Sequence, residues 1–249
     1  MKSILMTKIA ALPMFLAIMT GTLMVGGCKP SNSDNGRLAT SVDFPRPYRP
    51  VSKLSGTSFS TEAKRDAAGE AKQVMEWATM TPGMTVADLG AGEGYYTVRL
   101  AEKVGEKGRV LAQDIDKGAL ERLGERVSRD RLDNVAIKEG AIDDPRLPPN
   151  SFNRIFLVHM YHEVSEPYPF LWRLRPALAK GGEVIVVDRD RPTEAHGIPP
   201  KLLFCEFEAV GFRLKGFVEK LEVGGYFARF EAIGPRPEPG AIKACAKTK

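Results

Sequence analysis

Three glycines in the sequence have the spacing of a loop that binds a nucleotide-like ligand. Gly90, Gly92 and Gly94 follow an apolar segment, residues 84–89, and precede a segment with helical character. A glycine-rich turn between a strand and a helix lets a ligand approach the backbone closely. Position 95 is a tyrosine, whereas a dinucleotide fingerprint has its third glycine there. The spacing therefore departs from that of a dinucleotide site.

Carboxylates around this loop indicate a ligand without phosphate. Asp88 and Glu93 flank the glycines and would repel a pyrophosphate. Asp114 ends the next expected strand, where an acidic side chain accepts hydrogen bonds from ribose hydroxyls. Asp143 follows the third expected strand, where it can accept from an adenine amino group while Ile142 packs on the ring. An adenosyl ligand with a sulfonium and an ammonium, S-adenosylmethionine (SAM), fits this charge pattern.

A second set of chemical side chains follows the fourth expected strand. The run from His159 to Glu163 contains two of the three histidines in the chain. Ligands of open α/β sheets bind at the carboxyl ends of the strands, so His162 or Glu163 is the candidate general base and Tyr161 a lining residue. Asp188, which ends the fifth expected strand, is expected to face the same cleft.

Two other interpretations of this run are open. His162 could be a loop histidine that only bonds to the backbone, because a titratable side chain at a sheet edge can also have a purely structural role. A metal ion held by His159, His162 and a carboxylate is disfavoured because the spacing lacks a helical ligand pattern. We therefore expect no metal.

An alternating series of helices and strands is needed to place these residues together. A helix is expected from Ser60 or Thr61 to about Met80, and Asp116 is expected to cap another that starts near Lys117. A further helix should run from Pro167 to Gly181-Gly182, and two β segments at 213–223 and 226–233 follow. The pattern predicts an α/β fold with a doubly wound, mostly parallel seven-stranded sheet and a C-terminal antiparallel hairpin, in a single domain.

Five segments together resemble the class I SAM-dependent methyltransferases. VADLGAGEGYYTVRLA (86–101) resembles motif I, VLAQDID (110–116) motif II, and EGAIDD (139–144) the adenine-contacting segment. SFNRIFLVHMYHEV (151–164) is similar to the fourth strand with its active-site loop, and LRPALAKGGEVIVVD (174–188) to the fifth-strand motif. The resemblance covers about residues 60–234. It implies that the three glycines lie at the methionine moiety, Asp114 at the ribose and Asp143 at the adenine; Asp88, Ile142 and His159 complete the expected cofactor-binding set.

The resemblance implies a SAM-dependent methyltransferase that acts on an unidentified small molecule or lipid head group. His162, Glu163 and Asp188 are then the candidate catalytic residues, because methyl transfer requires a positioned acceptor and, for some acceptors, removal of a proton. The alternative is a SAM-binding module of the cell envelope without catalytic activity. A nicotinamide-dependent oxidoreductase comes third and is disfavoured by Tyr95.

The N-terminus has the pattern of an export signal. Residues 1–27 contain Lys2 and Lys8, then an uncharged apolar run, and small residues lead to Cys28. Val25-Gly26-Gly27-Cys28 resembles a bacterial lipobox. We expect a membrane-anchored lipoprotein exposed to the periplasm, attached through acylated Cys28; an uncleaved anchor at 1–27 is the alternative.

The remaining segments complete the expected organisation. Residues 28–59 are predicted to be a tether or an N-terminal arm, residues 60–234 the methyltransferase domain and residues 235–249 a polar tail. The net charge of +5 falls to +3 without the two leader lysines, which does not favour nucleic acid. Cys205 is expected in the core and Cys245 at the surface, and a disulfide between them in an oxidising compartment is the disfavoured alternative. The oligomeric state is not predicted.

Overall fold

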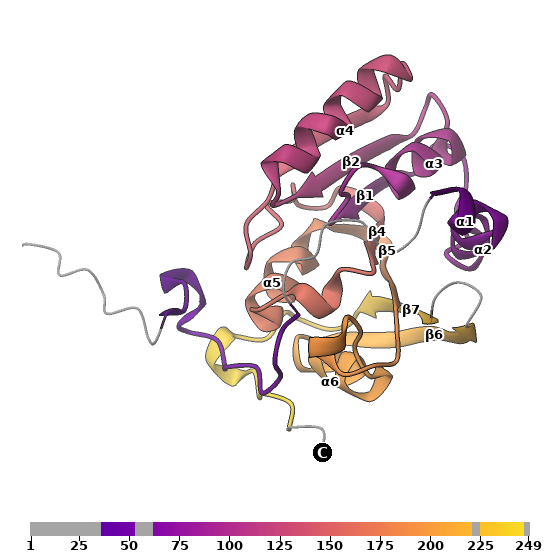
Figure 1. Cartoon of the computed structure of the whole chain (residues 1–249). Coiled ribbons are helices and arrows are strands. Elements are labelled where there is room, and N and C mark those ends of the chain that lie inside the picture. Colours follow the sequence, from indigo (N-terminus) through magenta and orange to yellow (C-terminus); the bar gives the residue numbers. More distant parts are fainter. Residues whose placement is uncertain (1–35, 53–61, 221–224, 247–249) are drawn as a thin grey trace, which may run out of the picture. The chain divides into compact units, whose positions relative to one another are not determined.

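Seven strands form a mixed sheet in the order β3-β2-β1-β4-β5-β7-β6 (Figure 1). The computed structural model describes residues 36–52, 62–220 and 225–246. The strands are β1 (Thr85–Leu89), β2 (Arg109–Asp114), β3 (Val135–Glu139), β4 (Phe152–Val158), β5 (Leu178–Asp188), β6 (Phe212–Lys220) and β7 (Gly225–Ala232). The helices are α1 (Glu62–Ala67), α2 (Glu70–Trp77), α3 (Tyr95–Val104), α4 (Lys117–Arg129), α5 (Pro167–Leu174) and α6 (Pro200–Ala209). Strands β1 to β5 run parallel and β7 is antiparallel to its neighbours, so the predicted fold is confirmed.

Helices cover both faces of the sheet. Val86 of β1 packs with Leu100 of α3 in one apolar cluster, and Leu89 packs with Phe207 of α6 in another. Leu123 of α4 packs on β2 from the same side as α3. Side chains alternate between the two faces of a strand, so Val86 and Leu89 lie on opposite faces of β1. Both faces of the sheet are covered, which explains the apolar strand sequences.

The strand order reverses between β1 and β4. β1 pairs with β2 on one side and β4 on the other, and all three run parallel. Their carboxyl ends therefore meet at one edge, where the chain turns away in opposite directions. This switch point is the usual ligand position of a doubly wound sheet.

Two predicted helices are shorter than expected. The first is interrupted at Gly69, which has a φ of 66°, and ends at Trp77; residues 53–61, with its expected cap, lie outside the described residues. The second ends at Leu174, because Pro176 cannot continue an α-helix. Gly181 and Gly182 lie within β5 and do not end a helix.

Residues 36–52 lie against the domain, in contacts typical of an arm. Arg37 forms an ion pair with Glu166, with Nη2 and Oε2 2.6 Å apart. Phe44 is buried and makes an edge-on contact with Trp172, with ring centroids 5.5 Å apart. Residues 28–35 of the predicted tether, and the whole predicted leader, lie outside the described residues.

A disulfide joins Cys205 of α6 to Cys245 near the C-terminus, so the expectation of unpaired cysteines was wrong. The C-terminal segment folds back over α5. Its Pro237 carbonyl accepts a hydrogen bond from Trp172 at 2.8 Å, and the Cys245 N–H donates to the Tyr168 hydroxyl at 2.7 Å. Cys245 is consequently buried, although the composition of this segment is polar.

Breaking this disulfide is expected to lower the free energy of unfolding by about 4 kcal/mol, the chain-entropy value for a loop of this length. The cysteines are 40 residues apart in sequence. Denaturant titration of the Cys205→Ser, Cys245→Ser variant would measure the change. Cys28→Ser, which leaves the pair intact, serves as the control, and equal stability of all three proteins would contradict the prediction.

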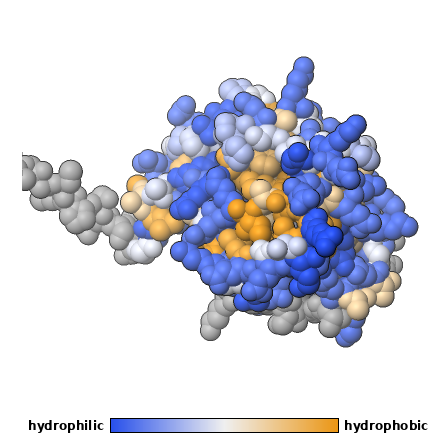
Figure 2. Space-filling model, turned by 90° about the horizontal axis from the view of Figure 1, so that it is seen from above, coloured by the Kyte–Doolittle hydropathy of each residue, from blue (hydrophilic) through white to orange (hydrophobic). Residues whose placement is uncertain are grey.

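Large apolar side chains are mostly buried, and a few lie at the surface of the described residues. Leu38, Val42 and Tyr48 on the arm, together with Ile142 and Ile233, are exposed. Figure 2 shows a face on which hydrophobic residues gather in a central area surrounded by hydrophilic ones. Within the described ranges no helix has the length and apolar character needed to cross a membrane.

Candidate functional site

The glycine loop between β1 and α3 depends on its glycines. φ is 68° at Gly90, 54° at Gly92 and 89° at Gly94, all in the region that disfavours side chains. A Cβ at Gly90 would lie 2.8 Å from Cγ of Met160, and one at Gly94 would collide with Leu123. The loop thus lies directly against the segment that follows β4.

Asp114 holds this loop from the end of β2. Its Oδ2 accepts a hydrogen bond from the Gly92 N–H at 2.8 Å. Its Oδ1 accepts from the N–H groups of Ile115 at 2.7 Å and Asp116 at 3.0 Å. Asp116 caps α4 through two backbone N–H groups of the first turn, as predicted. The half-buried Asp114 carboxylate lies beside the loop, where the predicted contact with a ribose is geometrically possible.

Asp88 lies beneath the loop rather than at its surface. Its Oδ2 accepts a hydrogen bond from the Thr97 hydroxyl at 2.7 Å. Burial raises the pKa of Asp88 to about 7, although the Thr97 hydrogen bond opposes this, and the charge of Asp114 adds to the rise. Asp88 therefore ties β1 to the first turn of α3, and its direct contact with a cofactor stays a prediction.

The predicted adenine contacts lie next to the arm. Asp143 Oδ2 accepts hydrogen bonds from the hydroxyls of Thr40 at 2.5 Å and Ser41 at 2.8 Å, and from Arg173 Nη1 at 2.7 Å. Burial would raise the pKa of Asp143, but these three bonds outweigh it and lower the pKa. Ile142 is exposed beside this carboxylate. The arm thus engages the carboxylate assigned to the adenine amino group.

His162 is held in one orientation by Asp188. It lies in the 3₁₀ turn Tyr161–Glu163 after β4 and is 2% exposed. Its Nδ1 lies 2.9 and 3.0 Å from the two carboxylate oxygens of Asp188, which ends β5. Because an ionised carboxylate only accepts hydrogen bonds, Nδ1 is the donor to Asp188, and in a neutral imidazole Nε2 then has the lone pair. Nε2 has no hydrogen-bond partner among the described residues.

This pair has the arrangement of a general base and its orienting carboxylate. The Asp188 carboxylate also accepts a hydrogen bond from the Arg189 N–H at 2.8 Å, and Asp188 is fully buried. His162 bonds to a side-chain carboxylate, which differs from the alternative interpretation of a loop histidine that bonds only to the backbone. The catalytic roles themselves stay predictions.

His159 lies apart from this pair, with Glu70 of α2. Its Nε2 lies 3.6 Å from Glu70 Oε1, and its φ of 53° is in the left-handed region. Burial would raise the pKa of Glu70, but the neighbouring His159 and the hydrogen bonds from Arg65 outweigh it and lower the pKa to about 2. The structure therefore does not join His159 to His162 as the ligand pair considered from the sequence.

Arg49 of the arm fixes the turn that carries His162. Its Nε lies 2.8 Å from Glu206 Oε1, and both side chains are buried. Its guanidinium also donates to the carbonyls of His162 at 3.2 Å and Val164 at 2.9 Å. Tyr161, expected to line the cleft, is instead fully buried and donates to Glu206 Oε2 at 2.8 Å.

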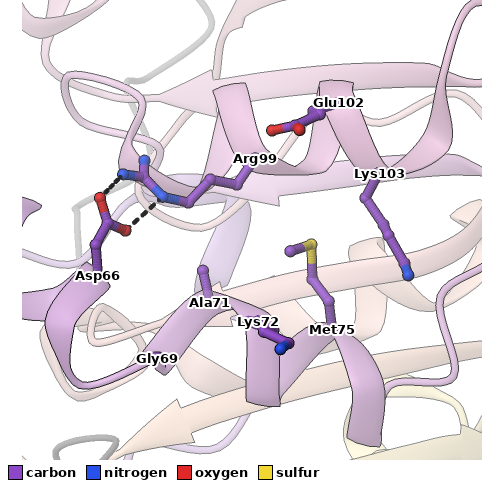
Figure 3. A pocket seen from close by; sticks show the side chains of 8 residues that line it. All are labelled: Asp66, Gly69, Ala71, Lys72, Met75, Arg99, Glu102 and Lys103. Atoms are coloured by element: carbon purple, nitrogen blue, oxygen red, sulfur yellow. Dashed lines mark hydrogen bonds and ion pairs between the residues drawn. The ribbon is translucent and has the colours of Figure 1, made fainter.

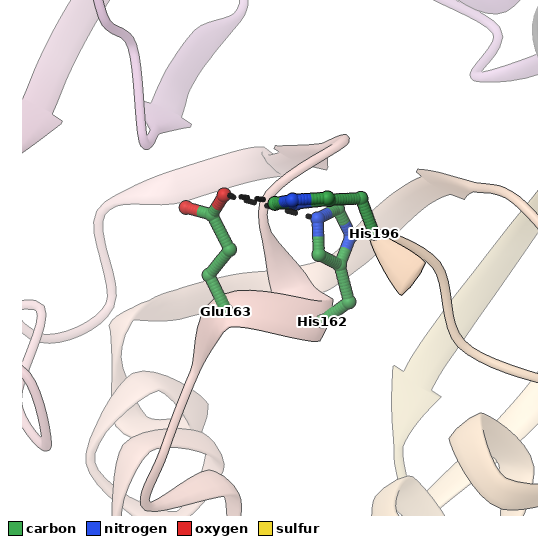
Figure 4. A group of neighbouring side chains, drawn as sticks. All are labelled: His162, Glu163 and His196. Carbon is green, nitrogen blue, oxygen red and sulfur yellow. Dashed lines mark ion pairs between the residues drawn. The ribbon is translucent and has the colours of Figure 1, made fainter. Parts of the chain in front are cut away.

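Glu163 and His196 complete a cluster with His162 (Figure 4). Glu163 Oε1 lies 3.8 Å from His162 Nε2 and 3.9 Å from His196 Nδ1. The two imidazole rings meet edge-on, with centroids 5.7 Å apart. His196 follows a 3₁₀ turn in the loop after β5.

A surface pocket of about 470 Å³ lies elsewhere, between α2 and α3. Figure 3 shows the Asp66–Arg99 ion pair on one side of it and Met75 near Lys103 on the other. Its lining comes from the outer sides of these helices and not from the carboxyl ends of the strands. It is therefore separate from the candidate site.

No role in the site was predicted from the sequence for Arg49, Glu70 or His196. His196 is the third histidine and follows Asp188 by eight positions, which is the one available signal. Arg49 lies in a segment with the composition of a tether, and Glu70 looks like an ordinary residue of a charged helix. Only the folded chain shows that both are buried.

Comparisons with known proteins agree on one family. Residues 80–206 match the model of a family described as a methyltransferase domain. The ubiquinone/menaquinone biosynthesis C-methyltransferase UbiE of Shewanella sp. (strain ANA-3) is 29% identical over 151 residues, which cover 56% of this chain and 60% of the relative. The chain thus spans less than two thirds of that relative's length.

Solved structures give the same architecture. A SAM-dependent methyltransferase from Aquifex aeolicus is 26% identical with a TM-score of 0.57, covering 69% of this chain and 97% of that one. The [4+2]-cyclase SpnF has a TM-score of 0.58 at 13% identity, covering 74% of this chain and 87% of that one. The second likeness shows the fold alone.

Proposed function

Because the chain belongs to the class I SAM-dependent methyltransferases, we propose that it transfers the methyl group of SAM to an acceptor that loses a proton. SAM is the methyl donor of this family, and the predicted cofactor is confirmed at that level. The observation that carries the proposal is the His162–Asp188 pair. Nε2 of His162 has no hydrogen-bond partner among the described residues. The segment that contains His162 contacts the glycine loop through Met160.

The residues at the strand ends are proposed to form two groups, one that binds the cofactor and one that accepts a proton. Bound SAM would supply an electrophilic methyl group, with S-adenosylhomocysteine as the leaving group. The glycine loop and Asp114 hold the adenosyl and methionine parts. His162 Nε2 accepts the proton that the acceptor releases, and Asp188 stabilises the imidazolium that results.

The acceptor is proposed to be a small molecule or a lipid head group with a hydroxyl, an amine or an acidic C–H. The UbiE relatives are named as C-methyltransferases of quinone biosynthesis, which supports a small, lipid-soluble acceptor. Labelled SAM incubated with the purified protein and a cell extract would test this, with separation of the labelled products. Label in a small-molecule or lipid fraction is expected. SAM binding without any transfer would instead favour the non-catalytic, SAM-binding module.

Replacing Asp114 with alanine is expected to weaken SAM binding by about 10- to 100-fold, the cost of losing hydrogen bonds to a charged acceptor. Calorimetric titration with SAM would measure the affinity. Asp116→Ala is the matched control, because Asp116 caps α4 and does not bond to the glycine loop. Equal SAM affinity of the Asp114 variant and the wild type would contradict the assignment.

An envelope location is part of the proposal. The leader at 1–27 and the lipobox-like sequence before Cys28 support export, with Cys28 acylation or an uncleaved anchor as the membrane attachment. The Cys205–Cys245 disulfide supports an oxidising compartment. Labelling with a fatty acid, combined with protease treatment of intact and permeabilised cells, would test both parts. A chain that carries no fatty acid, and that stays protected from protease after the outer membrane is permeabilised, would contradict both parts.

A further inference from the structure

The buried Nε2 of His162 faces two more side chains that can bind a metal ion. Nε2 of His162, the Glu163 carboxylate and Nδ1 of His196 all lie within 4.8 Å of one another. In a tetrahedral zinc site with 2.0–2.1 Å bonds, neighbouring donor atoms are about 3.3 Å apart. The 3.8 and 3.9 Å separations from Glu163 Oε1 are therefore close to those of a loaded site.

His162 has the support that metal-binding histidines usually have. Asp188 accepts a hydrogen bond from Nδ1, and in a neutral imidazole this leaves a lone pair on Nε2, which lies 3.8 Å from Glu163 Oε1. A carboxylate behind a histidine fixes the tautomer and the ring orientation of a ligand and raises its basicity. His162 is 2% exposed, so water does not compensate its Nε2 in the way it would at the surface.

The loop of His196 is also held in place. The His196 backbone has a φ of 56° and follows the 3₁₀ turn Thr193–Ala195. Thr193 donates a hydrogen bond from its hydroxyl to the Pro50 carbonyl at 2.6 Å, and Ile198 N–H donates to Arg189 O at 2.8 Å. The arm and the end of β5 thus fix this loop on both sides of the histidine.

We propose that His162, Glu163 and His196 bind one divalent transition-metal ion of the zinc type. Two imidazoles and one carboxylate are a set that zinc and its first-row neighbours accept, whereas magnesium and calcium prefer more oxygen ligands. Three protein ligands leave one position of a tetrahedral ion for water or for an oxygen of a second ligand. The site goes beyond the proposed methyl transfer and does not depend on it. An ion bound to Nε2 would occupy the lone pair that accepts the acceptor's proton, so the metal-bound chain could not use His162 as the base in methyl transfer.

The test is metal binding by the tag-free full-length chain after treatment with a chelator. Titration with Co²⁺, followed by its visible absorption, and competition by Zn²⁺ should give one ion per chain. Asp188→Asn should weaken binding by about 10- to 100-fold, the usual cost of losing a carboxylate behind a ligand. His196→Ala, which removes a ligand, should weaken it further.

Glu194→Gln is the control, because Glu194 is an exposed carboxylate near His196 in sequence and lies outside the cluster. Unchanged SAM affinity of each variant would show that it is folded. Wild-type protein that binds no Co²⁺, or a His196→Ala variant that binds it as tightly as the wild type, would overturn the proposal. Neither result bears on methyl transfer, which is measured separately with labelled SAM.

Discussion

Replacing His162 with glutamine is expected to lower the rate constant of methyl transfer by about 10²- to 10⁴-fold, the range for loss of a general base. Glutamine can still donate to Asp188 but cannot take up a proton. The affinity for SAM should stay within a few-fold of the wild-type value, because His162 is bonded to Asp188 and not to the glycine loop. Single-turnover transfer of labelled methyl and calorimetric titration with SAM would measure the two quantities.

Lys201→Gln provides the control for this experiment, since Lys201 is exposed on α6. Its rate constant and SAM affinity should both match the wild type. A His162→Gln variant that keeps more than a tenth of the wild-type rate would show that His162 has a structural role alone. A His162→Gln variant that no longer binds SAM would show that His162 takes part in binding the cofactor.

Replacing Arg49 with methionine is expected to lower the free energy of unfolding by about 3–5 kcal/mol, because it leaves a buried charge without its partner. That charge is on Glu206, which also accepts the Tyr161 hydroxyl. Burial would lower the pKa of Arg49, but the charge of Glu206 outweighs it and raises the pKa, so the guanidinium stays charged. Urea unfolding would give the difference.

Two further variants separate the ion pair from general packing. Asp43→Asn changes an exposed charged residue of the same arm and should leave stability nearly unchanged. Adding Glu206→Gln to Arg49→Met removes the unpaired charge, so part of the lost stability should return. A loss below 1 kcal/mol for Arg49→Met would mean that the arm does not stabilise the domain.

The sheet could be predicted because its signals are local. An apolar run such as 84–89, followed by glycines, predicts a strand, a turn and a helix from neighbouring residues alone. The helix predicted from Pro167 to the glycines at 181–182 is too long, because Pro176 already prevents its continuation.

The site could be predicted only in part, because its supports come from distant segments. Strand ends placed Asp114, His162 and Asp188 at one edge, since parallel strands share a carboxyl edge. Arg49 packs on this region and Cys245 on α5 and α6, both from segments with polar composition, and no local periodicity indicates that they are buried. Long-range pairing of this kind is visible only once the chain is folded.

Titration of the purified protein with SAM, beside NADH as the competing ligand class, tests the central claim most directly. The glycine spacing, Tyr95 and the carboxylates Asp88 and Asp114 predict one SAM site per chain, weakened in Asp114→Ala, and no binding of NADH. Binding of NADH with no heat on addition of SAM would contradict the assignment of the cofactor and with it the account of His162 as the base in methyl transfer.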